Sequence, residues 1–573
     1  MKVVNVAGCA LLFTLTFFAV IPVDAWSQPS RPGSEAMQGV DGLTSQVEDA
    51  QSPPNLSPPK DSQRQDSVDR PQAPPGEDQS APSAQGSKSS PKPPPLEKAA
   101  PEKIISPKEA KELFRSVDEI LQFASEDTGL PIKRKVKRRL TKRDEVQAYI
   151  EKSLREDKDA QRLERSSAVL KKFGLLPRNF NLSTFLVQML REQVAGYYDP
   201  KTSSINLLNW LDQDEQKPVL AHELTHALQD QSFGLEKFMK SPEENDSAKR
   251  PKSPSVDDIR TDEQSSARQA VVEGQAMVVL LDYTLAPTGK SLLNSPQIVE
   301  ALKQGMLVGS ADSPAFRDAP IFLKEELTFP YRFGLDFTAA LLKAGGKQLA
   351  YAGAFTNPPK TTREIMEPQT YLKHETLEPL KIIDMQKDFK DYDAFDIGAM
   401  GEFDVDILVE QYGGRDESDA LYPAWRGGYY FAGKLKADKN APIVISYVSR
   451  WSEASKAAEF AAVYAKSLAK RYDKRQALDA NGKIEADAPP PESWRTLRGL
   501  HAWLTEEGVV TIDVRGDTVM VSEGLDAATT ERATDDLWPV HDRDKQDKKD
   551  KKDKDNYDKN EHQNLEQPPP VSP

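Results

Sequence analysis

The chain has 573 residues, a formal net charge of −14 and a single cysteine, Cys9. The acidic balance argues against general nucleic-acid binding, and one cysteine excludes a scaffold of intramolecular disulfides. The length allows two or three domains once non-globular segments are set aside.

Residues 1–25 have the pattern of a secretory signal peptide. The chain opens with Met1-Lys2, continues through a long apolar run and reaches Val23-Asp24-Ala25. We therefore expect an exported protein that is periplasmic, cell-surface or secreted. The alternative is an uncleaved anchor that tethers the chain to a membrane or cell wall, because the apolar run approaches the length of a membrane span. A third alternative is a lipid on Cys9, although Cys9 precedes most of the apolar run, whereas a lipobox cysteine follows it.

Two segments are predicted to be disordered. Residues 26–102 are rich in Pro, Ser, Gln and Asp and contain few large apolar side chains, so they suit a tether. Residues 541–573 alternate Lys and Asp and end in a Pro-rich stretch, which suits a solvated tail. Between them we expect an α+β, mainly helical fold, with a larger region at 103–400 and a smaller α/β region at 401–540.

The first expected elements lead toward a β-hairpin. A capping box at Ser106-Pro107-Lys108-Glu109 predicts the start of a helix. Residues 132–143 are strongly basic and are interpreted as a solvated strand in preference to a nucleic-acid surface. Helices are expected at 144–157, 160–173 and 182–193. Residues 194–209 indicate strand, turn and strand, with Asp199-Pro200-Lys201-Thr202 as a type I turn.

Residues 219–231, VLAHELTHALQDQ, predict a helix that carries a metal site. His222 and His226 lie four residues apart, so both imidazoles stand on one helical face and can reach one metal ion. Glu223 can flank that metal and meet a bound water without being a ligand. The alternative is a helix with chance histidines. It is disfavoured because the chain has only six histidines and because a buried His-Glu-His set without a metal would be costly.

A third ligand is expected from Glu273, in a predicted helix at 267–283. Apolar neighbours imply that Glu273 is deeply buried, where a carboxylate needs a compensating cation such as zinc. Gly274 would let another backbone approach closely. One alternative ligand is Asp230, which follows His226 by four residues but lies about 6 Å further along the helix axis. Another alternative is that Glu273 forms a salt bridge with Arg268 or another basic residue.

The C-terminal region is expected to mix strands and helices. Residues 441–449 predict a strand and residues 453–472 a helix. Two further strand patterns flank Arg515-Gly516-Asp517. We interpret this tripeptide as a hairpin turn and not as an adhesion motif.

The stretch VLAHELTHALQDQ resembles the active-site helix of zincin metallopeptidases. That resemblance implies one zinc ion held by His222 and His226, with Glu223 as general base. Gln229 and Ser232 stand where the metzincin branch needs Gly and His, so that branch is excluded. The gluzincin branch takes its third ligand from a glutamate on a later helix, which fits Glu273.

The wider set GYYDP, HELTHALQDQ and AVVEGQA is similar to a group of poorly characterised exported bacterial HExxH proteins. The resemblance covers residues 190–285, and more loosely 330–346 and 357–368. In that group the last block often ends with His before Pro, whereas this chain has Glu367 there.

The expected function is that of an exported zinc-dependent endopeptidase acting on a protein or peptide substrate. A metal-bound water would attack the peptide bond while Glu223 takes its proton. A further donor would stabilise the oxyanion, and the candidates are Tyr197, Tyr198, Tyr331, His374, Tyr429 and His501. The alternative is a cell-envelope binding or assembly protein with a structural or vestigial metal site. A fourth protein ligand would favour that alternative, whereas Glu223 favours the enzyme.

Overall fold

The computed structural model describes residues 13–15, 104–156, 160–240, 256–295, 297, 300, 313–486 and 490–539. The expected tether at 26–102 and tail at 541–573 lie outside these residues, as does the expected signal segment apart from 13–15. All described residues belong to one compact unit. Within them, no helix combines the length and apolar character needed to cross a membrane.

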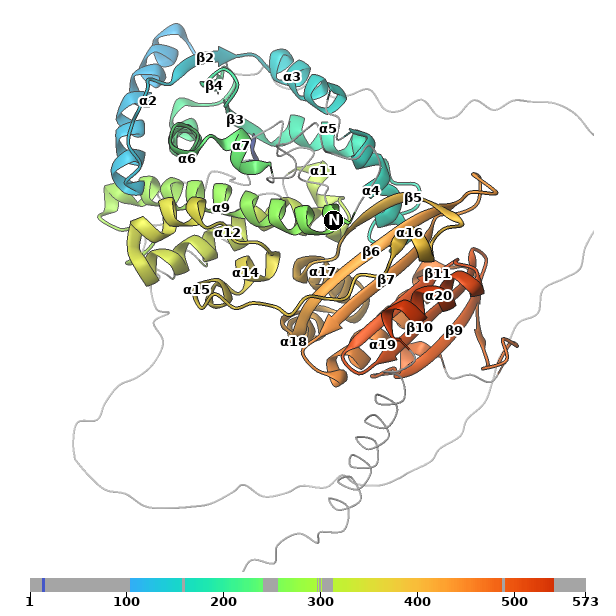
Figure 1. Ribbon diagram of the computed structural model, residues 1–573. Helices are drawn as coiled ribbons and strands as arrows, with labels where there is room; N and C mark the ends of the chain where they lie inside the picture. Colours follow the sequence, from blue (N-terminus) through green and yellow to red (C-terminus); the bar gives the residue numbers. More distant parts are fainter. Residues whose placement is uncertain are drawn as a thin grey trace, which may run out of the picture. The chain divides into compact units, whose positions relative to one another are not determined.

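The fold is α+β and mainly helical, as expected (Figure 1). The helices of the N-terminal part are α2 (Pro107–Thr128), α3 (Arg143–Glu156), α4 (Ala160–Lys172), α5 (Leu182–Gln193), α6 (Gln213–Phe233), α7 (Leu235–Met239), α9 (Asp257–Leu285), η2 (Ala286–Thr288), α11 (Pro314–Arg317) and α12 (Ile321–Lys347). Those that follow are η3 (Gln348–Gly353), α13 (Ala354–Thr356), α14 (Thr362–Met366), α15 (Pro368–Leu372), α16 (Met385–Asp388), α17 (Glu402–Gly413), α18 (Arg415–Leu421), η4 (Tyr422–Ala424), α19 (Ala454–Arg471), η5 (Pro491–Ser493) and α20 (Ala527–Leu537).

A small sheet precedes the HExxH helix. Its strands are β1 (Phe13–Leu15), β2 (Lys137–Thr141), β3 (Val194–Asp199) and β4 (Ser204–Leu208), in the order β1-β3-β4-β2. Strands β3 and β4 form the expected antiparallel hairpin, and the exposed basic strand β2 runs parallel to β4. On the far side of β3, β1 pairs antiparallel, with Phe13 opposite Tyr197.

Sequence signals at the helix ends are confirmed. Ser106 accepts a hydrogen bond from the Glu109 backbone, and the Glu109 side chain accepts one from the Ser106 backbone, so the capping box starts α2. Helix α6 ends at Gly234, whose φ of 72° is in the left-handed region that glycine tolerates. Helix α9 begins at Asp257, ten residues before the expected start. Residues 257–266 therefore belong to the same helix as Glu273.

Helices α9 and α12 pack side by side (Figure 1), and two glycines let their backbones come into contact. A Cβ atom added to Gly274 would overlap the backbone carbonyl of Gly334, and one added to Gly334 would overlap the carbonyl of Ala270. The expected close approach at Gly274 is therefore confirmed. This contact brings the helix that carries Glu273 against the helix that carries Tyr331.

The C-terminal part is built on a seven-stranded sheet in which every neighbouring pair is antiparallel. Its order is β5-β6-β7-β11-β10-β9-β8, and its strands are β5 (Tyr392–Ala399), β6 (Trp425–Leu435), β7 (Val444–Trp451), β8 (Arg475–Leu478), β9 (Gly499–Thr505), β10 (Gly508–Arg515) and β11 (Thr518–Glu523). The predicted strand, helix and hairpin correspond to β7, α19 and β10–β11. Helix α19 packs in the core on one face of the sheet, and α20 packs on the other.

Candidate metal centre

Helix α6 places both histidines on its buried face. Asp212 caps its first turn by accepting a hydrogen bond from the Asp214 backbone. His222 and His226 are fully buried, their ring centroids lie 4.6 Å apart, and their Nε2 atoms lie 3.0 Å apart. As their four-residue spacing predicts, the two imidazoles lie on one face of the helix and their Nε2 atoms converge on one point.

Helix α9 brings Glu273 to the same point. The Glu273 Oε2 atom lies 3.1 Å from His222 Nε2 and 3.4 Å from His226 Nε2. Glu273 is 2% exposed, as the apolar residues around it in the sequence had indicated. His222, His226 and Glu273 form the one group of three or more potential metal-binding side chains among the described residues.

The spacing of these atoms fits a tetrahedral metal site. Zinc bound at about 2.0–2.1 Å by nitrogen and oxygen ligands would have ligand–ligand edges of about 3.3 Å. The three measured separations are 3.0, 3.1 and 3.4 Å, close to that edge. Two histidines and a glutamate are also a ligand set that catalytic zinc uses. The described residues therefore fit a metal ion with three protein ligands.

The electrostatics of the group favour a cation at its centre. Burial lowers the pKa of His222 to about 4, so this imidazole is neutral and can bind a metal. Burial also acts to lower the pKa of His226, but the Glu273 carboxylate outweighs it and raises that pKa. Burial would raise the pKa of Glu273, yet His226 and His222 lower it to about 2. A negative carboxylate thus faces two imidazoles, where a positive charge is stabilised.

A glutamine relay fixes the orientation of His226. The Gln229 amide nitrogen lies 3.0 Å from the Val272 carbonyl, which can only accept, so the Gln229 oxygen must face His226 Nδ1, 2.8 Å away. His226 Nδ1 therefore donates a hydrogen bond, which leaves the Nε2 lone pair for a metal. Gln275 accepts from Gln229 and donates to the Ala350 carbonyl at 2.8 Å.

Sequence reasoning did not assign a function to Gln229 or Gln275. A signal existed for Gln229, because it follows His226 by three residues and so lies on the same helical face. No such signal existed for the contact between Gln275 and a backbone carbonyl at residue 350.

Glu223 is buried next to the histidines but points toward the hairpin. Its Oε2 atom accepts a hydrogen bond of 2.7 Å from the Tyr198 backbone on β3. Glu223 is not among the three clustered ligand atoms, although its charge helps to raise the pKa of His226. Glu223 therefore lies between the metal-binding helix and the hairpin without being one of the three clustered ligands.

Six residues were proposed as donors to the oxyanion. Among the contacts of the described residues, Tyr331 is the one of the six whose ring lies against a histidine of the candidate metal centre. Its ring lies 6.3 Å from that of His222. The other five make contacts that indicate structural roles. Tyr197 stacks on Tyr149, Tyr198 donates to Asp230, His374 lies against Tyr371, Tyr429 donates to the Lys381 carbonyl, and His501 packs beside Trp494 and Trp503.

Asp230 is held away from the cluster. Its Oδ2 atom pairs with Arg134 at 2.7 Å and accepts from the Tyr198 hydroxyl at 2.9 Å. Its Oδ1 atom accepts from the Leu235 backbone just beyond the helix end. These contacts make Asp230 a helix-end residue.

The alternative salt bridge between Glu273 and Arg268 is not present among the described residues. Arg268 donates to the Lys240 carbonyl at 3.0 Å and lies over the Phe238 ring. Glu367, at the position where the similar proteins often have histidine, pairs with Arg363 at 3.1 Å. Neither Arg268 nor Glu367 belongs to the His222–His226–Glu273 group.

Comparisons with models of protein families, with curated proteins and with solved structures found no match to this chain.

Proposed function

We propose that the protein is an exported zinc-dependent endopeptidase of the gluzincin type. The observation that carries the proposal is a buried set of three potential metal ligands with a second carboxylate, that of Glu223, beside them. His222, His226 and Glu273 would hold one zinc ion and leave one coordination position open. Within the described residues no fourth protein ligand joins the set, which is the difference between a catalytic and a structural zinc site.

When bound, zinc would act as a Lewis acid and lower the pKa of a water molecule at the open position. Glu223 would take the proton of the attacking water and return it to the leaving amine. The Tyr198 backbone N–H holds the Glu223 carboxylate in place for both transfers. Tyr331 is the best-placed donor for the oxyanion, because its ring lies beside His222.

The small sheet supports a peptide as the substrate. Strand β3 contacts the metal centre through Tyr198, and its outer edge already pairs antiparallel with Phe13–Leu15 of the same chain. A strand edge that pairs with one extended segment can also pair with an extended peptide, because backbone hydrogen bonds do not depend on side-chain identity. An extended substrate on this edge would pass close to Glu223.

The experiment compares two substitutions on helix α6 in the full chain. Glu223→Gln should keep its zinc, measured by metal analysis, and should lose cleavage of a broad peptide library by about 10²–10⁴-fold. Glu215→Gln makes the same chemical change at an exposed position of the same helix and should alter neither.

The outcomes separate the parts of the proposal. Full activity in Glu223→Gln would refute the assigned base. Absence of zinc from the unaltered protein would refute the metal centre. One zinc ion per chain with no cleavage of any peptide would instead favour a cell-envelope binding or assembly protein.

A further inference from the structure

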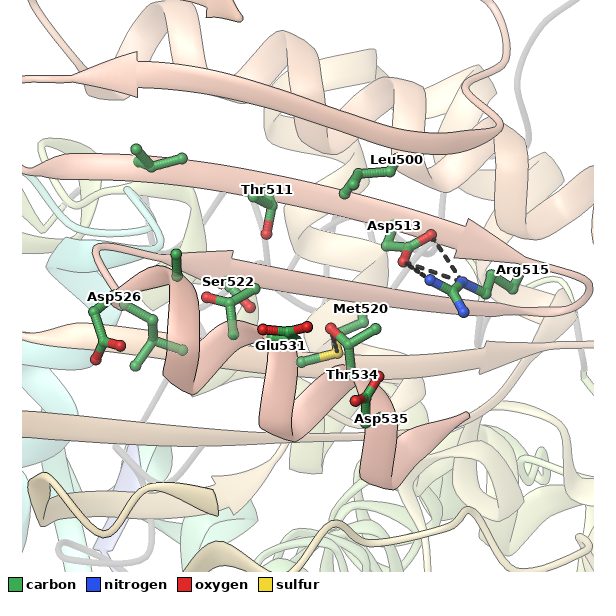
Figure 2. Close-up of a pocket in the computed structure, with 14 residues that line it drawn as sticks. Leu500, Thr511, Asp513, Arg515, Met520, Ser522, Asp526, Glu531, Thr534 and Asp535 are labelled. Atoms are coloured by element: carbon green, nitrogen blue, oxygen red, sulfur yellow. Dashed lines mark hydrogen bonds and ion pairs between the residues drawn. The ribbon is translucent and has the colours of Figure 1, made fainter. Parts of the chain in front are cut away.

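A cavity of about 430 Å³ lies between helix α20 and the outer face of strands β9, β10 and β11 (Figure 2). This volume is in the range of small-molecule sites, about 300–1,000 Å³. None of the elements around it contributes a residue to the proposed zinc centre, so its properties do not depend on the proposed function.

The floor of the cavity is apolar. Leu500, Val509 and Met520 face it from the sheet, and Leu525 closes one end. Leu500 is 66% exposed, an unusual exposure for a leucine on a folded sheet. A ligand with an apolar stem would cover this side chain and remove it from water.

The rim of the cavity is acidic. Asp513, Asp526, Glu531 and Asp535 line it against a single guanidinium, Arg515. Arg515 is already used, because it pairs with Asp513 at 2.7 Å and lies over the Trp538 ring. The helix side therefore carries an excess of negative charge. Figure 2 shows Glu531 and Asp535 on α20, with the Arg515–Asp513 pair at one end.

One buried polar group faces the cavity without a partner. Ser522 is 2% exposed and lines the cavity, and its hydroxyl has no hydrogen-bond partner among the described residues. A buried hydroxyl without a hydrogen bond has lost its contacts with water and gained none in return. A ligand that hydrogen-bonds to Ser522 would compensate for this loss.

We propose that this cavity binds an organic cation, namely a primary ammonium or guanidinium group carried on an apolar stem. The stem would lie over Leu500 and Met520, and the cationic group would lie near Glu531 and Asp535. The Ser522 hydroxyl would accept a hydrogen bond from the cationic group. The same chemistry occurs in a free aliphatic amine and in a lysine or arginine side chain of a peptide.

The test uses isothermal titration of the full chain with matched probes. Hexylamine represents the free amine, and acetyl-Leu-Lys-Leu-amide represents the peptide. Hexanol and hexanoate have a stem of the same length with no charge or with the opposite charge. Saturable one-site binding of hexylamine or of the peptide, tighter than that of hexanol and hexanoate, is the expected result.

Variants locate the binding. Removing both helix charges with Glu531→Gln and Asp535→Asn should weaken binding about tenfold, since each exposed ion pair contributes up to about 1 kcal/mol. Ser522→Ala should weaken it about fivefold without destabilising the free protein, because its hydroxyl has no internal partner to lose. Thr530→Phe should fill the cavity and abolish binding. Asp416→Asn, an exposed charge on α18, should leave binding unchanged.

Binding of hexylamine alone would assign the site to a free amine, and binding of the peptide alone would assign it to a protein or peptide. The proposal is overturned if neither cation binds or if hexanoate or hexanol binds as tightly. It is also overturned if the cation binds equally well to the Thr530→Phe and Glu531→Gln/Asp535→Asn variants, since that result would place the binding outside this cavity.

Discussion

Two buried glutamates, Glu273 in helix α9 and Glu523 in strand β11, are compensated in different ways. Glu523 is fully buried and pairs with the Arg471 guanidinium. It also accepts hydrogen bonds of 2.6 Å from the hydroxyls of Tyr464 and Tyr472. Its counter-charge is permanent, because arginine stays protonated in proteins.

Glu273 is equally buried, but its neighbours are two imidazoles that carry no fixed charge. Burial favours the neutral form of an imidazole, so the positive charge at this site must come from a bound proton or a metal ion. A carboxylate with a permanent internal partner stabilises the fold. A carboxylate whose neighbours are potential metal ligands can exchange its counter-ion, as a metal-binding residue must.

The largest effect on the free energy of unfolding is expected from substitution of Glu523, the glutamate with a permanent counter-charge. Glu523→Ala leaves Arg471 buried without a counter-charge and should lower the free energy of unfolding by about 3–5 kcal/mol in denaturant titrations. The control is Glu506→Ala, an exposed carboxylate near Arg178, which should lower it by less than about 1 kcal/mol. A small effect of Glu523→Ala would mean that this ion pair is not needed for the fold.

Removal of the metal should affect the Glu273 site alone. With zinc present at 100 times its dissociation constant, a chelator should lower the free energy of unfolding by about 2.7 kcal/mol. Glu273→Ala should abolish this difference, because the third ligand is lost. Asp230→Ala should retain it, and the reverse pattern would move the third ligand to Asp230.

The glutamine relay should contribute less than the ligands themselves. Gln229→Ala frees His226 Nδ1 from its acceptor and should weaken zinc binding about 10–100-fold in competition with a chromogenic chelator. Gln231→Ala, two residues further along the same helix, removes a buried amide that contacts residues 133 and 134 and should leave zinc affinity unchanged. Equal losses in both variants would attribute the effect to helix packing.

The last prediction concerns Gly274 and depends on whether a substitution there raises or lowers the free energy of unfolding. In a helix, glycine-to-alanine substitution normally stabilises by about 1 kcal/mol. At Gly274 the added methyl group would overlap the Gly334 carbonyl, so Gly274→Ala should destabilise by about 1–3 kcal/mol. Combining it with Gly334→Ala should cost less than the sum of the two. Stabilisation by Gly274→Ala would show that the two backbones are not in close contact.

The sequence was sufficient to predict the centre where local periodicity determines geometry. The spacing of His222 and His226 placed both rings on one face, and the apolar neighbours of Glu273 indicated its burial. The glycine after Glu273 predicted the close approach of another backbone. Each of these predictions depends on residues within one or two helical turns.

Features that depend on distant partners could not be predicted in this way. Strand β6 is buried on both faces over most of its length, so it lacks the alternation that identifies a strand. Helix α9 starts early because Asp262 and Glu263 are buried by tertiary contacts, although the sequence around them resembles a polar loop.

The contact between Gly274 and Gly334 also has a mechanical consequence. Two helices whose backbones touch at one point can rotate about that point far more easily than they can separate there. Glu273 lies one residue before Gly274 on α9, and Tyr331 lies three residues before Gly334 on α12. A swing of α12 against α9 would therefore move the helix ends by several ångströms while Glu273 and Tyr331 shift little. The spacing between Glu273 and Tyr331 would therefore be the part of this helix pair that such a movement changes least.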